Sequence, residues 1–347
     1  MSSETKPIII IGAGLVGLTL AQALRKAGFS FQIYDRDGSL DERPAGWGIT
    51  MHWALPALAS SLPPEVFAKL PSIQVDPVEG AKGMQCFQTI SYSSEAELAL
   101  DHDSFRFLDL STGLDKYNIE SSLHYRLNRK QFRQLLSTGI DVNWGKRFTE
   151  YELTDDGVVV HFADGTKVDG SMLLAVDGKN SRIKKLLLGD EISRLNPLPV
   201  AFMGLTLRLS PERMQPFRDI HPVLWQGTHP TSGYYIFFSM LSTPKSNGSS
   251  GTDNEYYEGQ FNMSWLVKQN GELPKASSEQ LAKMKSAALA DTGFFPALRQ
   301  AVLSIPDDTA LLEIKLEDWP TQQWPSQDGR VSLLGDAAHT MTMCKWF

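Results

Sequence analysis

The chain has 347 residues, of which 42% are hydrophobic and 21% are charged, and its 33 basic and 40 acidic side chains give a net charge of −7. This composition excludes an intrinsically disordered chain, because enough apolar surface is available to offset the entropy of ordering it. At roughly 150 residues a domain the length predicts about two domains, and the acidic balance argues against nucleic acid as a partner.

Metal and disulfide sites have no support in the sequence. Cys86 and Cys344 are the only cysteines, and they lie far apart. The seven histidines show no HExxH or similar helical pairing. We therefore expect no disulfide framework and no zinc site.

The segment 7–24 is apolar and uncharged, which raises the alternative of a signal peptide or a membrane span. Three glycines and two polar residues interrupt it, and no small-residue cleavage pattern follows. We therefore expect a cytoplasmic protein with no membrane span in this chain.

The same segment predicts a βαβ unit. Residues 8–11 are four isoleucines, a run typical of a strand buried on both faces of a parallel sheet. Leucine and alanine then recur at helical spacing through 15–24, and Gly28 offers a helix stop. Residues 31–34 predict a second strand.

A glycine motif, GxGxxG, joins the first strand to the helix. Gly12 permits the tight turn, Gly14 lets a pyrophosphate approach the backbone, and Gly17 lets the helix pack close to the strand. Asp35, at the end of the second strand, is placed to accept hydrogen bonds from a ribose. The motif predicts dinucleotide binding over a chance glycine turn, but it does not separate NAD from FAD.

The remaining pattern predicts a second, sheet-rich region. Alternating apolar residues indicate strands with one packed face, and Gly/Ser/Asn/Asp stretches indicate loops. The predicted elements are helices at 54–62, 129–136 and 278–305, a hairpin at 158–168, strands at 172–176, 203–209, 234–240, 260–267 and 330–334, and loops at 43–48 and 246–254, the latter mobile. The expected fold is α/β, with a nucleotide-binding domain at 1–190 and 325–347 and an interleaved sheet-and-helix domain at 191–324.

Two later segments separate FAD from NAD. The sequence DGKNSRIK at 177–184 follows the strand 172–176, and GDAAH at 335–339 follows the strand 330–334. Together with the glycine motif and Asp35, these segments resemble the three motifs of the flavoprotein aromatic hydroxylases, the single-component FAD-dependent monooxygenases related to p-hydroxybenzoate hydroxylase. Their order and spacing match over nearly the whole chain.

The resemblance implies a Rossmann-like FAD-binding domain and roles for individual residues. Asp35 would hold the adenosine ribose, and Gly48 would lie against the cofactor. Arg129 would contact FAD from its helix, although such a side chain can equally be a solvated helix charge.

The two later motifs also receive roles from the resemblance. Asp336, after Gly335, would bind the ribityl chain, while Asp177 and Gly178 would serve both FAD and the visiting NAD(P)H. The alternatives are that Asp177 and Gly178 form an ordinary turn and that Asp336 caps the next helix.

The sequence departs from the family in three places. Asp35 replaces the more usual Glu, and Lys184 stands where the family has Arg, so bidentate hydrogen bonding is lost there. The chain ends at 343–347, where the family continues with a proline, a glycine-rich turn and a long helix. A complete chain of this length is expected to hold FAD weakly, with one wall of the flavin site open to water; the other hypothesis is that its last residues come from read-through or a mistaken gene model.

The resemblance implies an enzyme of secondary metabolism that uses FAD, with NAD(P)H as co-substrate, to hydroxylate a phenolic, polyketide or other polycyclic small molecule. Alternatives are a flavin-dependent oxidase, dehydrogenase or reductase on the same scaffold, and a catalytically silent fragment. Labelled oxygen in the product would discriminate among the enzymes. The oligomeric state stays open.

The sheet of the second region should form the roof over the substrate. Its aromatic residues suit a flat substrate but equally suit an ordinary core; they are Trp225, Tyr234, Tyr235, Phe237, Phe238 and Trp265. Tyr234 or Tyr235 is a candidate to orient a phenol, and His52 a candidate base, but no motif supports either. The sequence therefore assigns no catalytic residue.

Overall fold

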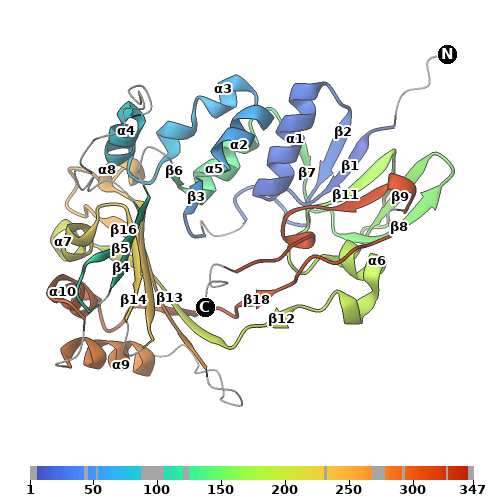
Figure 1. Ribbon diagram of the computed structural model, residues 1–347. Coiled ribbons are helices and arrows are strands. Elements are labelled where there is room, and N and C mark those ends of the chain that lie inside the picture. Colours follow the sequence, from blue (N-terminus) through green and yellow to red (C-terminus); the bar gives the residue numbers. More distant parts are fainter. Residues whose placement is uncertain are drawn as a thin grey trace, which may run out of the picture.

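The structure is a computed structural model that describes two packed regions, one built on a parallel sheet and one on a larger, mostly antiparallel sheet (Figure 1). Helices α7, α9 and α10 lie on the left side of the larger sheet in this view, and the parallel sheet lies to its right. The described residues are 6–42, 46–51, 54–86, 105–109, 111–119, 125–229, 233–267, 278–290, 294–325 and 327–342.

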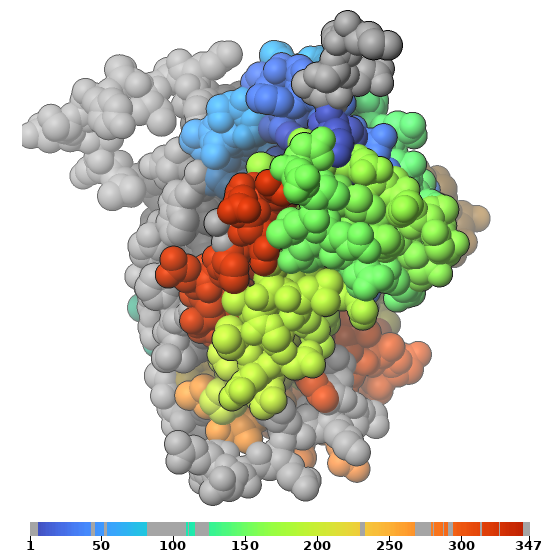
Figure 2. Space-filling view, turned by 90° about the vertical axis from the view of Figure 1, so that its right-hand side faces the viewer, coloured from blue at the N-terminus to red at the C-terminus, as the bar shows by residue number. Residues whose placement is uncertain are grey.

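The parallel sheet has five strands in the order β19-β11-β1-β2-β7, and every neighbouring pair is parallel. It therefore joins the two ends of the chain to its middle. Figure 2 shows the same juxtaposition on the surface, where the red C-terminal segment lies against green segments from the middle of the chain. The strands are β1 (Ile8–Ile11), β2 (Phe31–Tyr34), β7 (Val142–Asn143), β11 (Met172–Ala175) and β19 (Val331–Leu333).

Both faces of this sheet are covered, as the isoleucine run predicts. Ile10 packs in one buried cluster, while Ile9 and Ile11 pack in another on the opposite face. The first cluster includes residues of α1 (Leu15–Ala27), α2 (Leu55–Ser61) and α5 (Arg129–Leu136). The second includes residues of α6 (Arg182–Ile192) and of a three-stranded sheet, β8 (Phe148–Thr154), β9 (Gly157–Phe162) and β10 (Lys167–Gly170).

The turn from β1 to α1 requires glycine at two positions. Gly12 has φ +115°, and a Cβ there would lie 2.3 Å from the Val176 carbonyl oxygen. A Cβ at Gly17 would lie 1.9 Å from the Gly12 carbonyl oxygen. The helix ends at Gly28, whose φ of 76° forms the left-handed cap expected from the sequence.

The larger sheet has seven strands in the order β17-β13-β16-β15-β14-β4-β5. Two of them, β4 and β5, come from the segment 1–190, so the chain contributes to this sheet before it completes the parallel one. The division into domains stays a prediction. The strands are β4 (Phe105–Asp109), β5 (Asp115–Ile119), β13 (Val200–Leu209), β14 (Leu224–Thr228), β15 (Tyr235–Ser242), β16 (Tyr257–Leu266) and β17 (Leu311–Glu313).

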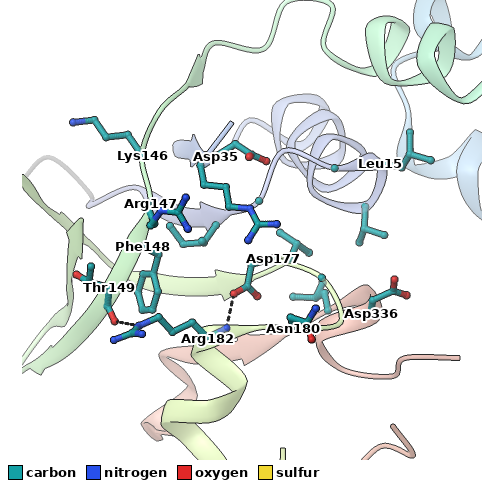
Figure 3. Close-up of a pocket in the computed structure, with 18 of the residues that line it drawn as sticks. Leu15, Asp35, Lys146, Arg147, Phe148, Thr149, Asp177, Asn180, Arg182 and Asp336 are labelled. Carbon is teal, nitrogen blue, oxygen red and sulfur yellow. Dashed lines mark hydrogen bonds between the residues drawn. The ribbon is translucent and has the colours of Figure 1, made fainter. Parts of the chain in front are cut away.

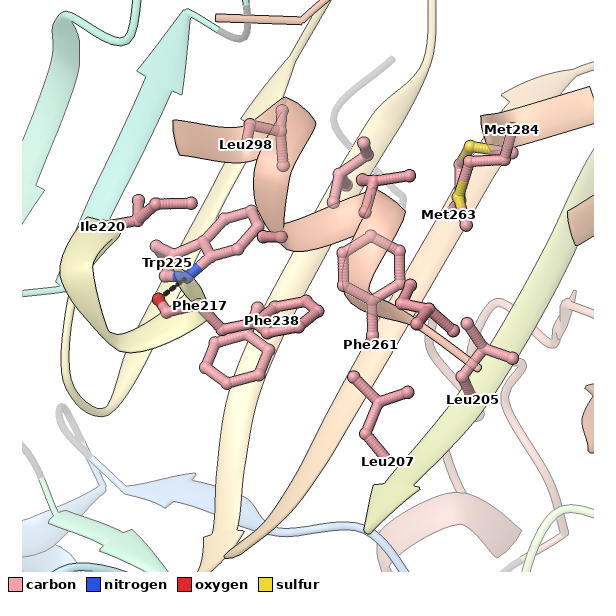
Figure 4. Packing of buried hydrophobic residues seen from close by; sticks show 14 of the residues in the cluster. Leu205, Leu207, Phe217, Ile220, Trp225, Phe238, Phe261, Met263, Met284 and Leu298 are labelled. Atoms are coloured by element: carbon pink, nitrogen blue, oxygen red, sulfur yellow. Dashed lines mark hydrogen bonds between the residues drawn. The ribbon is translucent and has the colours of Figure 1, made fainter. Parts of the chain in front are cut away.

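One face of this sheet forms the largest buried cluster with α7 (Pro211–Ile220), α9 (Ser278–Leu289) and α10 (Pro296–Ser304). Figure 4 shows Trp225 and Phe238 within it, and the Trp225 indole N–H donates to the Phe217 carbonyl at 3.0 Å. For Trp225 and Phe238 the core alternative is therefore correct. Tyr234 and Trp265 also pack against this cluster. Along β15, Tyr235 and Phe237 alternate with Ile236 and Phe238 of this cluster, so they lie on the opposite face, which we call the inner face.

Two predicted segments differ from the structure. The segment 278–305, predicted to be mostly helical, is divided into two helices, because Pro296 starts α10 and the residue before it, Phe295, has a non-helical ψ of 157°. The loop predicted at 246–254 contains the end of α8 (Pro244–Asn247), whose N-terminus is capped by Thr243 and Ser246. The other elements are α3 (Pro64–Phe67), α4 (Pro77–Cys86), β3 (Ile49–Met51), β6 (Tyr125–Leu127), β12 (Asn196–Pro197) and β18 (Glu317–Asp318), with 3₁₀ turns at Leu70–Ile73, Gln327–Gly329 and Gly335–Ala337.

Candidate cofactor-binding site

A cavity of about 560 Å³ lies at the carboxyl ends of the parallel strands, which is where open α/β sheets bind their ligands. Figure 3 shows side chains from separate segments of the chain projecting around it. Six of the nine predicted cofactor residues line it. They are Gly12, Gly14, Asp35, Arg129, Asp177 and Asp336.

The glycine turn leaves room for a ligand at one position. A Cβ added at Gly14 would meet no atom within 4 Å, although Gly14 lines the cavity. Gly14 also precedes α1 and offers no side-chain cap, and the first helical turn carries no acid. The helix therefore presents backbone N–H groups and its positive end to the cavity, as an anion-binding site requires.

Asp35 is 4% exposed and holds the glycine turn against the end of β2. Its Oδ2 accepts a hydrogen bond from the Ala13 N–H at 2.6 Å, and its Oδ1 accepts one from the Asp37 N–H at 2.9 Å. A carboxylate offers about four acceptor positions. Asp35 thus orients the turn and lines the cavity at the same time.

Asp177 has one oxygen that lacks a partner. Its Oδ2 accepts a hydrogen bond from the Arg182 N–H at 3.0 Å, whereas its Oδ1 is buried without a hydrogen bond. Burial raises the pKa of this carboxyl group above its ordinary value. A buried oxygen without a partner is costly, so the cavity suits a ligand that donates a hydroxyl group here.

Lys184, which replaces the arginine of the resembled family, is 1% exposed. Its Nζ donates to the Lys179 carbonyl at 3.0 Å and lies 4.4 Å from the centre of the Trp319 ring. Burial lowers the pKa of this amine, and the nearby Asp177 and Asp336 oppose that shift. Lys184 thus lies close to Asp177 and Asp336 but does not line the cavity.

The cavity carries more basic than acidic side chains, in contrast to the net negative chain. Three carboxylates line it beside five cations, which are Arg36, Arg129, Lys146, Arg147 and Arg182. Sequence reasoning gave a role only to Arg129 among these cations and included Arg182 in the second motif, but it missed Arg36, Lys146 and Arg147. Lys146 and Arg147 follow the end of β7 after two intervening residues, so a strand prediction there would have placed them near this edge. The excess of positive charge suits an anionic ligand such as a pyrophosphate.

The other three predicted residues, Gly17, Gly48 and Gly335, lie outside the lining. A Cβ at Gly17 would strike the glycine turn, and one at Gly335 would lie 3.0 Å from the Val16 side chain. A Cβ at Gly48 would lie 2.8 Å from the Arg126 Nε, so Gly48 packs against that guanidinium group. The proposed cap by Asp336 is not seen, since Leu334 occupies the N-cap position and no side chain caps the turn.

Several expectations remain outside the described residues, which exclude His52, 43–45 and 343–347. The open flavin wall therefore stays a prediction. Within the part of the chain that the structure describes, no group of three or more His, Cys, Asp or Glu side chains is arranged to hold a metal. No helix of the same part is both long enough and apolar enough to cross a bilayer.

Comparisons with known proteins agree with this geometry. A family model described as an NAD(P)-binding Rossmann-like domain matches residues 10–47, which hold the glycine turn and Asp35. The chain is 44% identical over 346 residues to the FAD-dependent monooxygenase dbaB of Emericella nidulans, spanning 98% of this chain and 82% of that protein. It is 30% identical over 340 residues to the FAD-dependent monooxygenase cctM of Talaromyces islandicus, spanning 98% and 78%.

A solved structure has the same fold. Klebsiella pneumoniae HpxO, complexed with FAD and uric acid, matches with a TM-score of 0.59 at 18% identity, covering 97% of this chain and 74% of that one. The cavity, the motif order and these relatives point to one kind of protein.

Proposed function

Because the chain belongs to the family of FAD-dependent monooxygenases, we propose that it uses NAD(P)H and O₂ to hydroxylate a phenolic, polyketide or other polycyclic small molecule. In the net reaction one oxygen atom enters a C–H bond of the substrate and the other leaves as water. NAD(P)H supplies the two electrons, and a proton from solvent balances the reaction. Bound FAD supplies the redox chemistry.

The observation that carries the proposal is the convergence of three distant motifs on one cavity. The glycine turn, Asp177 and Asp336 all line it. The cavity also combines an open Gly14, a helix N-terminus and an unpartnered carboxylate oxygen. These features fit an elongated dinucleotide that has an anionic centre and hydroxyl groups on either side.

Each lining residue then has a proposed task. The N-terminus of α1 beside Gly14 binds the pyrophosphate, and Asp35 accepts hydrogen bonds from the adenosine ribose. Asp177 accepts a hydroxyl hydrogen bond through Oδ1, and Asp336 binds the ribityl chain. Arg129 stabilises the negative charge of the phosphates from the start of α5.

The inner face of the seven-stranded sheet supports the proposed substrate class. Phe202, Tyr235 and Phe237 lie on strands of this face, and each is buried. Aromatic walls with a few polar groups suit a flat molecule with polar substituents. Such walls also exclude water, which protects the reduced cofactor from unproductive reaction.

The test is oxygen incorporation by the purified chain. Aerobic NADPH and NADH oxidation is measured with and without a panel of phenols, and active compounds are repeated under ¹⁸O₂. We expect a flavin spectrum that bleaches with the reduced nicotinamide, and one labelled oxygen atom in each product molecule. Unlabelled product would indicate an oxidase or dehydrogenase, and a protein that binds no flavin would indicate a silent fragment.

A further inference from the structure

Arg133 is an arginine of α5 that contacts the glycine turn from outside the cofactor cavity. It lies one helical turn after Arg129, and its side chain is 12% exposed. Arg129 lines the cavity, whereas Arg133 does not. The Arg133 Nε donates a hydrogen bond to the carbonyl oxygen of Ala13, at 3.0 Å. Ala13 lies between the first two glycines of the motif and is fully buried.

The rest of the guanidinium group contacts two further segments. Its Nη1 donates to the Leu40 carbonyl at 2.9 Å, and its Nη2 lies 3.4 Å from the Asp37 Oδ2. Its central carbon lies 5.5 Å from the centre of the Trp144 ring. Ala13 follows β1, Leu40 and Asp37 follow β2, and Trp144 follows β7. One side chain therefore joins the segments at the carboxyl ends of three adjacent strands.

These contacts form a closed ring of hydrogen bonds around Ala13. The Ala13 N–H donates to the Asp35 Oδ2 at 2.6 Å, and the Asp37 N–H donates to the Asp35 Oδ1 at 2.9 Å. The Asp37 side chain accepts from Arg133, which in turn donates to Ala13. A residue held on both its N–H and its carbonyl by connected partners has a single orientation.

That orientation determines where the next backbone N–H points. The peptide bond between Ala13 and Gly14 is trans, so its carbonyl and its N–H point in opposite directions. Arg133 holds the carbonyl from outside the cavity. The N–H on the other side of this peptide belongs to Gly14, which lines the cavity at the N-terminus of α1.

Arg133 contributes geometry to the site, because its charge is paired. Asp37, whose side chain is 8% exposed, forms an ion pair with it. The pair adds no net charge beside the cavity. Arg36 and Arg147 differ in this respect, since they line the cavity and are exposed to solvent. Removing one of those charges weakens an electrostatic attraction, whereas changing Arg133 alters the shape of the turn.

We propose that Arg133 is a positioning residue of the cofactor site, which orients the peptide between Ala13 and Gly14 so that the Gly14 N–H donates to the pyrophosphate of FAD. It also fixes this peptide relative to Asp35, the proposed acceptor for the ribose. Arginine is required because lysine has one nitrogen and cannot reach the three segments together. The inference rests on the proposed function, which assigns the pyrophosphate to the N-terminus of α1.

The test measures FAD dissociation constants with the full chain, from FAD fluorescence as the FAD-loaded protein is diluted at low and high salt. Arg133→Lys keeps the charge and should weaken FAD binding about tenfold, by the same factor at both salt concentrations. Lys130→Gln is the matched control, because Lys130 is an exposed cation of the same helix that pairs with Asp41 at 3.1 Å. Arg208→Gln, at an exposed arginine of the large sheet, is a distant control. Each control should change the constant less than about twofold.

A double-mutant cycle separates positioning from a general loss of structure. Arg133 and Gly14 act on the same peptide, so Arg133→Lys should cost less than about threefold when Gly14→Ala is already present. In the Arg147→Gln background the same change should still cost about tenfold, since the two act independently. A merely structural arginine would give the same factor in both backgrounds.

The melting temperature and FAD content of each variant are recorded as purified. If Arg133→Lys cannot be obtained folded, Asp37→Asn removes the paired carboxylate and should weaken FAD binding about threefold, again with a smaller loss in the Gly14→Ala background. Unchanged FAD binding by Arg133→Lys, a loss that shrinks with salt, or a loss independent of Gly14→Ala would overturn the inference and leave the proposed function intact. A wild-type protein that binds no flavin would contradict the proposed function, and the inference with it.

Discussion

The cofactor cavity and the inner face of the large sheet differ in what builds them. The cavity depends on backbone geometry, because Gly12, Gly14 and the N-terminus of α1 shape it. The inner face depends on side chains that alternate along strands, as Gln260 and Asn262 do on β16. Backbone geometry leaves a motif that can be read from the sequence, whereas an alternating strand has the same pattern whichever ligand its polar face binds.

The largest expected effect is a difference in stability loss between substitutions on the two faces of the large sheet. Phe238→Ala should lower the free energy of unfolding by about 3–5 kcal/mol, because Phe238 is fully buried in the main core. Phe237→Ala should cost less, since Phe237 packs in a small cluster with Leu224 and Tyr235, but it should raise KM for the substrate. Urea denaturation and steady-state kinetics check both, and equal losses of stability would contradict the division into core and inner faces.

The second prediction assigns different roles to two glycines of one motif: Gly17 serves packing, and Gly14 serves FAD binding. Gly17→Ala should destabilise the protein by about 1–3 kcal/mol, because the added Cβ overlaps a backbone carbonyl. Gly14→Ala should leave the stability of the FAD-free protein unchanged and weaken FAD binding about tenfold, or about 1.4 kcal/mol. Denaturation and FAD fluorescence titration measure the two effects. A destabilised Gly14→Ala protein would show that Gly14 serves packing.

The third prediction concerns the unpartnered oxygen of Asp177. Burial raises its pKa in the folded state above the ordinary value of 3.8, so folding favours the protonated form. Its stabilising contribution is full below pH 3.8 and is lost as the pH rises through the folded-state pKa. Asp177→Asn should therefore stabilise the FAD-free protein at neutral pH by roughly 1 kcal/mol.

The same substitution should remove that decline of stability with pH, and it should weaken FAD binding because the amide replaces an acceptor oxygen. Melting temperatures of the FAD-free proteins between pH 4 and pH 8 provide the check. Parallel pH profiles for the two proteins would exclude Asp177 as the titrating group.

The smallest expected effect tests the positive charge of the cavity. Arg147→Gln and Arg36→Gln should each weaken FAD binding about two- to fivefold, because both side chains line the cavity but are exposed to solvent. The loss should shrink as the salt concentration rises, since exposed charges are screened. FAD titrations at low and high salt measure this, with Arg208→Gln as the control; an equal loss at both salt concentrations would rule out an electrostatic origin.

The sequence predicted the parts of the fold that depend on local signals. The first two strands have the bounds predicted, and α5 spans the predicted 129–136. The family and its FAD dependence follow from the glycine motif and the two later motifs, and the relatives confirm them. Six of the nine predicted site residues line one cavity, although their roles stay predictions.

The rest depends on contacts that no local pattern records. β7 has two residues, too few for a period to be detected, so Lys146 and Arg147 were not assigned to the cavity. Arg126 was not singled out, because its burial arises from a contact with Gln260, more than a hundred positions away. The aromatic cluster could not be divided between core and inner face until the register of β15 was known.

The position of β19 also bears on how the chain folds as it is synthesised. Val331 pairs with Leu173, so the edge of β11 has no strand to cover it until synthesis has passed β19. Closing such a distant parallel pair requires entropy to be lost before the contacts form, which slows folding. While residues 176–330 are being made, the nascent protein therefore carries an uncovered apolar strand edge, which is a site for aggregation during that interval.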